Sequence, residues 1–261
     1  QKFCPEPIAA AISYLHTRPR DEVQRVLTLD FGGGTLDFCI LDRGRSGFKV
    51  LSTHGIGLGG DHIDQLLYRH LLFPHLGKGK IWRRKGFDRE IETPFPFEDY
   101  EDLLLNWAVT YTLNQNRFTA PVMECIESAG EDAKCFVRLR DIIKHNLSYV
   151  LFTKIKDLKA ELSISDSAAL DLEEIDLRVE LTRAEFESVI RKPLDQMTMA
   201  VDETLRKSRI DPSSIDVVLR TGGSSLIPAV KQILDQKFPG KVVEHDPFTS
   251  VAGGLAIASY E

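Results

Sequence analysis

The 261-residue sequence has no long hydrophobic run and few cysteines. No window approaches the roughly 18 apolar residues that a membrane-spanning helix needs, and the chain does not begin with the pattern of a signal segment. We therefore expect no membrane partner. The cysteines are scattered and lack CxxC spacing, so neither a zinc site nor a disulfide framework is indicated, and we expect a cytoplasmic protein with reduced thiols. The four cysteines are Cys4, Cys39, Cys125 and Cys135.

Basic residues are also fewer than acidic residues. The chain has 33 lysines and arginines against 39 aspartates and glutamates, which gives a formal net charge of -6. Because an acidic chain as a whole does not attract nucleic acid, we expect no such partner. The basic run from Lys78 to Lys85, around Trp82, is interpreted as part of an irregular, solvated segment at residues 74–99. The seven histidines include no pair with helical metal-site spacing and a supporting carboxylate.

Three glycine-rich turns are the most informative feature that the sequence does contain. The first, in the stretch VLTLDFGGGTLDFCILD at residues 26–42, separates two runs of β-favouring residues. One interpretation is a β-hairpin with a glycine-rich turn. The other is a phosphate cradle, because glycines allow successive backbone N–H groups to converge on one anion. Gly32, Gly33 and Gly34 would form this cradle, and the Thr35 hydroxyl would add a donor.

Two aspartates bracket this first turn. Asp30 and Asp37 could hold the hydrated Mg²⁺ that accompanies the phosphates of a nucleotide, since Mg²⁺ prefers oxygen ligands and keeps several of its waters. The alternative is that each aspartate bonds its own backbone as an ordinary turn residue. These seventeen residues alone leave both interpretations open.

The second glycine turn, residues 55–60, formally matches GxGxxG and precedes a predicted helix. A dinucleotide site would need an acidic residue about 20 positions further on, where this sequence is basic, so that interpretation is disfavoured. The alternative is a helix-entry turn that faces phosphate through Gly59 and Gly60. The third turn, Thr221-Gly222-Gly223-Ser224, again leads from a predicted strand into a helix.

The hydrophobic pattern predicts an α/β protein. Residues 99–115 are expected to form one helical segment with Trp107 on its buried face. A capping box at Thr182 and Glu185 is expected to open a long helix through residue 207, with a kink at Pro193. Further helices are expected at residues 8–15, 61–72, 224–236 and 248–259 and over the rest of 100–163, and strands at 26–29, 36–41, 48–54, 168–174, 175–181, 215–221 and 241–245.

The order of these elements predicts the organisation of the chain. Residues 1–60 and 181–261, from the two ends, are expected to form one α/β core. Residues 61–180 are expected to be an inserted, mostly helical subdomain. Because the sequence begins with Gln1 and enters a helical pattern at once, we expect it to be a segment of a longer protein.

Blocks of this sequence, in order, resemble the nucleotide-binding domain of the heat shock protein 70 family, within the actin-like ATPase superfamily. The combination is specific, whereas a single block would not be, and residues 72–150 match only loosely. The resemblance covers the second lobe of that domain and implies an actin-like ATPase (ribonuclease H-like) fold with a helical and β insertion subdomain. The blocks read EPIAAAISYL, DFGGGTLD, LGGDHID, VVLRTGGSSLIPAV and DPFTSVAGGLAIAS.

The resemblance also implies roles for individual residues. Glu6 and Asp30 would be catalytic, orienting a hydrated Mg²⁺ and the attacking water, and Asp37 would lie near a cation. Lys159 and Ser163, one helical turn apart, would grip the adenosine. The remaining nucleotide-binding residues would be Gly32, Gly33, Gly34, Thr35, Gly59 and Gly60 at phosphate or ribose, and Gly222, Gly223 and Ser224 beneath the base.

Three positions depart from the pattern of the family. Leu226 stands where the family usually has an arginine that stacks on the base, Ala160 where it has a basic residue, and Lys156 where it has an acidic one. The adenine pocket is therefore expected to be more apolar and to lack a cation–π contact of about 0.5–2 kcal/mol.

The resemblance implies ATP or ADP with Mg²⁺ as ligands, and ATP hydrolysis by the intact protein. The function would be that of a stress-response chaperone whose partners are co-chaperones and unfolded polypeptide clients. The first lobe of the family, with its own phosphate loop, would precede Glu6, so residues 1–261 alone are expected to be a weak or inactive ATPase. The alternatives are a small-molecule kinase of the same superfamily and a non-hydrolysing, actin-like binding or filament protein.

Overall fold

The computed structural model describes residues 5–18, 23–44, 47–128, 130–245 and 250–260. The chain divides into two compact units: unit 1 combines Gln1–Ile63 with Ile190–Glu261, and unit 2 is the continuous segment Asp64–Val189. Within the described ranges, no helix has the length and apolar character that crossing a membrane requires. Cys39, Cys125 and Cys135 are free thiols, and Cys4 lies outside the described residues.

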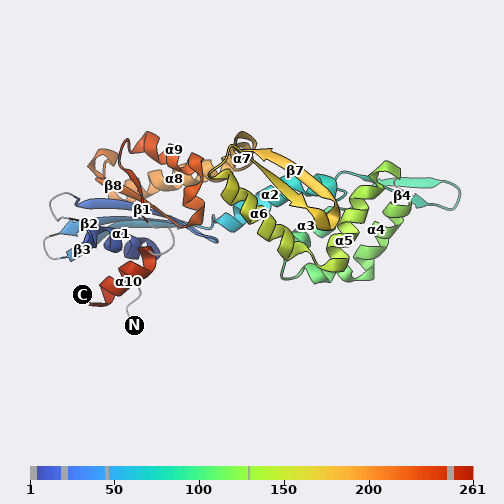
Figure 1. Ribbon diagram of the computed structural model, residues 1–261, viewed down its shortest axis with the longest axis horizontal. Coiled ribbons are helices and arrows are strands. Elements are labelled where there is room, and N and C mark those ends of the chain that lie inside the picture. The colour runs from blue at the N-terminus through green and yellow to red at the C-terminus, as the bar shows by residue number, and fades with distance from the viewer. Residues whose placement is uncertain (1–4, 19–22, 45–46, 129, 246–249, 261) are drawn as a thin grey trace. The chain divides into compact units, whose positions relative to one another are not determined.

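Unit 1 is built on a five-stranded mixed sheet (Figure 1). Its strands are β1 (Arg25–Phe31), β2 (Leu36–Gly44), β3 (Gly47–Ile56), β8 (Val217–Thr221) and β9 (Val242–Glu244). Their order in the sheet is β3-β2-β1-β8-β9. The pairs β1–β2 and β2–β3 are antiparallel, whereas β1–β8 and β8–β9 are parallel, so the sheet joins both ends of the chain.

Helices cover both faces of this sheet. Figure 1 shows α1 (Glu6–His16) and α10 (Ser250–Tyr260) on one side, and α8 (Arg191–Ser208) and α9 (Pro228–Lys237) on the other. The alanine-rich α1 approaches β1 and β2 closely because its small side chains leave room, and it shares a core with residues of three strands. That core includes Ala11, Leu15, Val26, Leu41 and Leu219.

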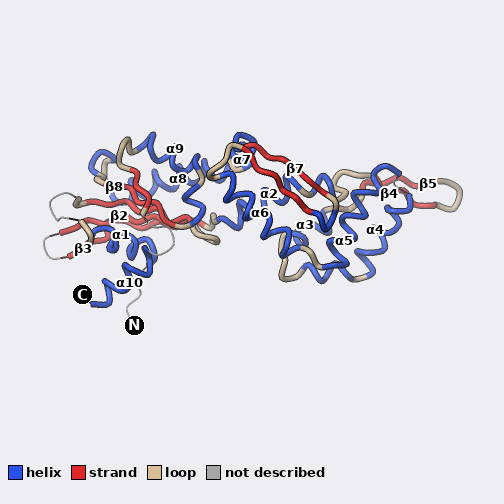
Figure 2. Tube along the Cα trace, viewed as in Figure 1, coloured by secondary structure: helices blue, strands red, loops and turns tan. Residues whose placement is uncertain are grey.

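Unit 2 is mostly helical and contains two β-hairpins (Figure 2). Its hairpins are β4 (Ile81–Lys85) with β5 (Glu90–Pro94), and β6 (Ser167–Leu172) with β7 (Leu177–Thr182). Buried aromatic rings form much of its core; Phe73 and Phe97, for example, pack edge to face with their ring centroids 4.9 Å apart. Its helices are α2 (Gly60–Leu71, which begins in unit 1), α3 (Glu98–Leu104), α4 (Asn116–Ser128), α5 (Ala133–His145), α6 (Ser148–Leu162) and α7 (Arg183–Val189).

The structure confirms the elements that the sequence predicts for the α/β core. The strands expected at residues 26–29, 36–41 and 48–54 fall within β1, β2 and β3, and the helix expected at 8–15 falls within α1. Residues 248 and 249, at the start of the last expected helix, lie outside the described residues. The capping box is also confirmed, because the Thr182 N–H donates to Glu185 Oε2 at 2.9 Å and the Glu185 N–H donates to Thr182 Oγ1 at 3.2 Å.

The prediction of an irregular segment at residues 74–99 is wrong. The basic run enters β4, which pairs with β5, and opposite charges face each other across the hairpin, with Arg83 Nε 2.7 Å from Glu92 Oε1. Such cross-strand ion pairs stabilise a strand without apolar alternation. The hairpin therefore forms from residues that a hydrophobic pattern does not identify as strands.

One helix prediction is also wrong, and in another the kink expected at Pro193 is a complete interruption. The expected single segment at residues 99–115 ends as an α-helix at Leu104, and Trp107 is 54% exposed instead of buried. Asn106 Oδ1 accepts a hydrogen bond from the Ala108 N–H at 3.2 Å, which favours a turn over a further helical turn. The long helix expected after Thr182 is divided into α7 and α8 at Ile190, because the Pro193 ring is incompatible with a helical carbonyl four residues earlier.

Candidate functional site

The first glycine turn is the tip of the β1–β2 hairpin, which confirms the hairpin interpretation. Asp30 pairs in register with Asp37, and the Gly32 N–H donates to the Thr35 carbonyl at 3.0 Å. Gly33, Gly34 and Thr35 are exposed at the tip. Within the described residues, the Gly33 and Gly34 N–H groups donate to no other protein group. The same tip therefore presents backbone donors to an anion, so the hairpin and cradle interpretations are compatible.

The second glycine turn docks directly onto the first. The N–H groups of Gly60 and Asp61 donate to the carbonyls of Gly32 and Gly33 at 2.9 and 2.8 Å. A Cβ atom at Gly59 would lie 2.0 Å from the Gly33 carbonyl oxygen, so only glycine fits there. These bonds bring the N-terminus of α2, with the positive end of its dipole, to the hairpin tip.

The third glycine turn follows β8, the strand that pairs with the edge of β1 opposite to β2. Asp30 pairs in register with Thr221 of β8, and Gly222 then adopts φ +79°, a conformation that favours glycine. A Cβ atom at Gly222 would lie 2.5 Å from the Phe31 carbonyl oxygen and 2.8 Å from Asp30 Oδ1. The chain continues as the short 3₁₀-helix Gly223–Leu226, in which Gly223 is exposed, Ser224 buried and Leu226 half-buried. All three turns thus converge on the same end of β1.

Acidic side chains gather at this convergence. Asp30 is only 6% exposed, and burial, together with the nearby Glu6 and Asp37 carboxylates, raises the pKa of Asp30 to about 7. Glu6 begins α1 and hydrogen-bonds Asp30, whereas Thr35 Oγ1 donates to Asp37 Oδ2 at 2.7 Å. Glu6, Thr35 and Asp37 also line a cavity of about 520 Å³. No group of three potential metal ligands occurs among the described side chains.

Lys159 and Ser163, the residues expected at adenosine, lie at the end of α6 in unit 2. Lys159 Nζ forms an ion pair with Asp64 Oδ1 at 2.6 Å, and Asp64 is 1% exposed. Ser163 Oγ donates to the Lys159 carbonyl at 3.1 Å. Asp64 lies in the LGGDHID block but was not predicted as a site residue, because nothing in the spacing predicts its pairing with a residue on α6.

Arg220 is a second residue near the site that was not predicted from the sequence. It is 5% exposed on β8, immediately before the third glycine turn, and its guanidinium donates to the Ser225 carbonyl within that turn. The signal in the sequence is a single cation at the end of the apolar run Val217-Val218-Leu219. A buried arginine needs such partners because an unpaired buried charge is very costly.

Comparison with known proteins identifies the family. The family described as Hsp70 protein matches residues 2–85 and 131–259 of the chain. Among curated relatives, the chaperone protein DnaK of Mycoplasmopsis pulmonis is 25% identical over 254 residues, which cover 96% of this chain and 34% of that protein.

Other DnaK proteins give the same result. DnaK of Prochlorococcus marinus is 26% identical over 96% of this chain and 32% of its own length, and DnaK of Ureaplasma urealyticum is 28% identical over 98% and 35%. The chain thus spans about a third of the length of the curated relatives that it matches. With a family match over most of its length and a five-stranded mixed sheet of the actin-like ATPase fold, the chain belongs to the Hsp70 family.

Proposed function

We propose that this chain is the second lobe of the nucleotide-binding domain of a chaperone ATPase, and that it binds Mg-ATP and Mg-ADP at its three glycine turns. The observation that carries the proposal is the convergence of these turns on one end of β1, beside the buried carboxylate of Asp30. Hairpin tips and helix N-termini that present backbone N–H groups are suited to phosphate.

The phosphate contacts follow from this geometry. The N–H groups of the exposed Gly33 and Gly34 would supply donors from the hairpin tip. The Thr35 hydroxyl would join them only by turning from Asp37 Oδ2, to which it donates in this structure, toward the phosphate. The start of α2 at Gly60 adds the positive end of a helix dipole. Gly32 and Gly59 act indirectly, because their close packing holds the two turns together.

We propose that the carboxylates hold a cation through its water ligands, since the described side chains include no group of three direct metal ligands. Asp30, Asp37 and Glu6 offer only oxygen donors, which Mg²⁺ prefers, and their mutual repulsion gives a cation at this position a favourable interaction. When bound, Mg²⁺ would neutralise phosphate charge. Asp30 and Glu6 would hold its water ligands and orient the attacking water, and the charge of the cation would keep the Asp30 carboxylate ionised.

The base contacts are proposed from the third turn and from α6. The backbone of Gly222, Gly223 and Ser224 would lie beneath the base, with Leu226 as an apolar contact. Lys159 and Ser163 would contact the adenosine. The absence of the arginine that the family usually places at position 226 would make this pocket depend on apolar and backbone contacts.

The chaperone role rests on family membership. The relatives named above are chaperone proteins, so we propose co-chaperones and unfolded polypeptides as partners of the intact protein, in a stress-response role. The free thiols of Cys39, Cys125 and Cys135 are compatible with a reducing, cytoplasmic location.

Titration calorimetry with Mg-ADP on the intact protein tests the nucleotide site. Gly59→Ala should weaken binding on the order of tenfold or more, because its Cβ would collide with the Gly33 carbonyl and separate the two turns. Gly57→Ala, in the same turn, is the matched control, since a Cβ there meets nothing within 4 Å. No binding of Mg-ADP by the unmodified protein, or equal binding by both variants, would contradict the proposed site.

A further inference from the structure

A positive charge is buried at the strand end that feeds the third glycine turn. Every residue of β8 is buried, and Arg220 is 5% exposed. Burial lowers the pKa of the Arg220 guanidinium, whereas the carboxylates of Glu244 and Asp235 oppose that effect. An apolar side chain of similar length would fill this space without the cost of desolvating a charge. We therefore expect the contacts of the guanidinium to indicate its role.

The contacts of Arg220 connect the turn to the neighbouring strand. One terminal nitrogen of the guanidinium donates to the Ser225 carbonyl, and the other lies 3.4 Å from Glu244 Oε2 on β9. Arg220 and Glu244 are also paired in register between β8 and β9. Glu244 thus helps to hold the guanidinium in the orientation that reaches the turn.

Ser225 donates the hydrogen bonds that close the turn. It is completely buried, and both its N–H and its Oγ donate to the Gly222 carbonyl, at 3.1 and 2.7 Å. Its own carbonyl accepts from Arg220. Because a buried carbonyl without a donor is costly, loss of the guanidinium would favour a different conformation of residues 222–226.

We propose that Arg220 is a positioning residue that fixes the turn at residues 222–226, and that it thereby sets both nucleotide affinity and the preference for adenine over guanine. This inference rests on the proposed function, in which Gly222, Gly223 and Ser224 lie beneath the base. Arg220 acts through the Ser225 carbonyl and does not touch the nucleotide. Its effect should therefore concern the base and leave the phosphate contacts of the other two turns unchanged.

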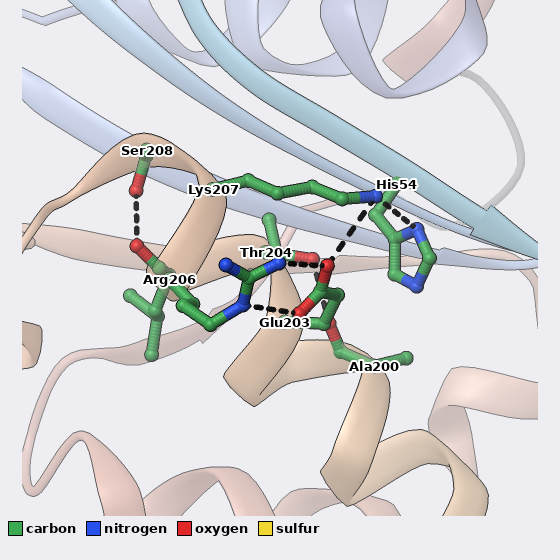
Figure 3. A network of polar contacts seen from close by, with 8 residues as sticks. His54, Ala200, Glu203, Thr204, Arg206, Lys207 and Ser208 are labelled. Carbon is green, nitrogen blue, oxygen red and sulfur yellow. Dashed lines mark hydrogen bonds and ion pairs between the residues drawn. The ribbon is translucent and has the colours of Figure 1, made fainter.

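The test compares three forms of the intact protein: unmodified, Arg220→Met, and Arg206→Met as a matched control. Arg206 lies on α8 of the same unit, where Figure 3 shows its guanidinium bonded to Glu203; its side chain is 73% exposed. Calorimetry gives the dissociation constants for Mg-ADP and Mg-GDP, and amide hydrogen exchange reports the opening of residues 221–226. Thermal unfolding without nucleotide identifies any variant that does not fold.

Arg220→Met should weaken Mg-ADP binding on the order of tenfold, reduce the ratio of ADP to GDP affinity, and speed exchange at residues 221–226. Arg206→Met should match the unmodified protein in Mg-ADP affinity, in the ratio of ADP to GDP affinity and in the exchange rate at residues 221–226. If Arg220→Met does not fold, Arg220→Lys, which keeps the charge but not the two-pronged donor, should show the same changes to a smaller extent. A folded Arg220 variant with unchanged ADP affinity and ADP/GDP ratio would overturn the inference alone, whereas failure of the unmodified protein to bind Mg-ADP would overturn the proposed function as well.

Discussion

Asp30 combines burial with two acidic neighbours, and this combination makes the stability of the protein depend on pH. The pKa of Asp30 rises from 3.8 to about 7 on folding, so the folded chain binds this proton more tightly than the unfolded chain does. Stability due to Asp30 therefore falls as the pH rises through the range from about 4 to about 7, and the full cost of the buried charge is present above that range.

Asp30→Asn removes this charge and should stabilise the nucleotide-free protein at pH 8, by about 2–4 kcal/mol. The gain should shrink as the pH falls toward 4, because Asp30 is then protonated in the folded state. Thermal unfolding of both forms at several pH values measures the difference. Asp88→Asn, at an exposed position in a loop, should show no such pH dependence, and a constant difference for Asp30→Asn would contradict the raised pKa.

Leu226 allows a substitution that should tighten nucleotide binding. Leu226→Arg restores the residue that the family usually stacks on the base, and a cation–π contact of about 0.5–2 kcal/mol should tighten Mg-ADP binding by about two- to thirtyfold. Calorimetry on the intact protein measures this change. Weaker binding would mean that the third glycine turn does not lie beneath the base as proposed.

At the scale of elements, the close crossing of α1 and α10 depends on one glycine. A Cβ atom at Gly254 would lie 1.7 Å from the Ala9 carbonyl oxygen, which is backbone and cannot rotate away. Gly254→Ala should therefore force the helices apart and destabilise the chain by about 2–4 kcal/mol in urea unfolding. Gly253→Ala is the control, because its Cβ would meet only the Ser13 side chain, with the hydroxyl oxygen nearest at 3.2 Å. A cost as large as that at Gly254 would contradict the crossing as described.

The elements also show what could be predicted from the sequence and what could not. β1, β2 and β3 were predictable because they are rich in β-favouring residues and end at glycine turns. The β4–β5 hairpin was not, because its pairing relies on Arg83 and Glu92 instead of apolar alternation. The end of α3 was missed because the turn signal, Asn106, lies inside an apolar-rich run.

The same distinction applies to the candidate site. Each glycine turn could be recognised from its own residues, but the docking of Gly60 onto Gly32 depends on tertiary packing. The pairing of Lys159 with Asp64 joins two helices that are far apart in the chain, and no local pattern encodes it. Whether these residues bind nucleotide stays a prediction.

At the scale of the molecule, residues 1–261 should fold without any preceding lobe, because helices already cover both faces of the five-stranded sheet. They should nevertheless hydrolyse ATP poorly. The resemblance to the family implies donors on another lobe, and each missing donor typically costs on the order of 10²–10³ in rate. Steady-state phosphate release with Mg-ATP measures this, with the intact protein as the reference. Equal turnover would mean that the whole catalytic apparatus lies within these residues.

The connection of β1 to β8 has a consequence for how the chain is made. The Arg25 N–H, at the start of β1, bonds Asp216, beside β8, across a sequence separation of 191 residues. Between them the ribosome synthesises all of unit 2 as one uninterrupted stretch, so unit 2 can complete its folding while the β1–β2–β3 meander still exposes the open edge of β1. Unpaired edges of this kind promote aggregation, and contacts so distant in sequence form slowly. During synthesis of this member of a chaperone family, we therefore expect the edge of β1 to stay exposed until β8 is made, and a chaperone bound there would protect the nascent chain from aggregation.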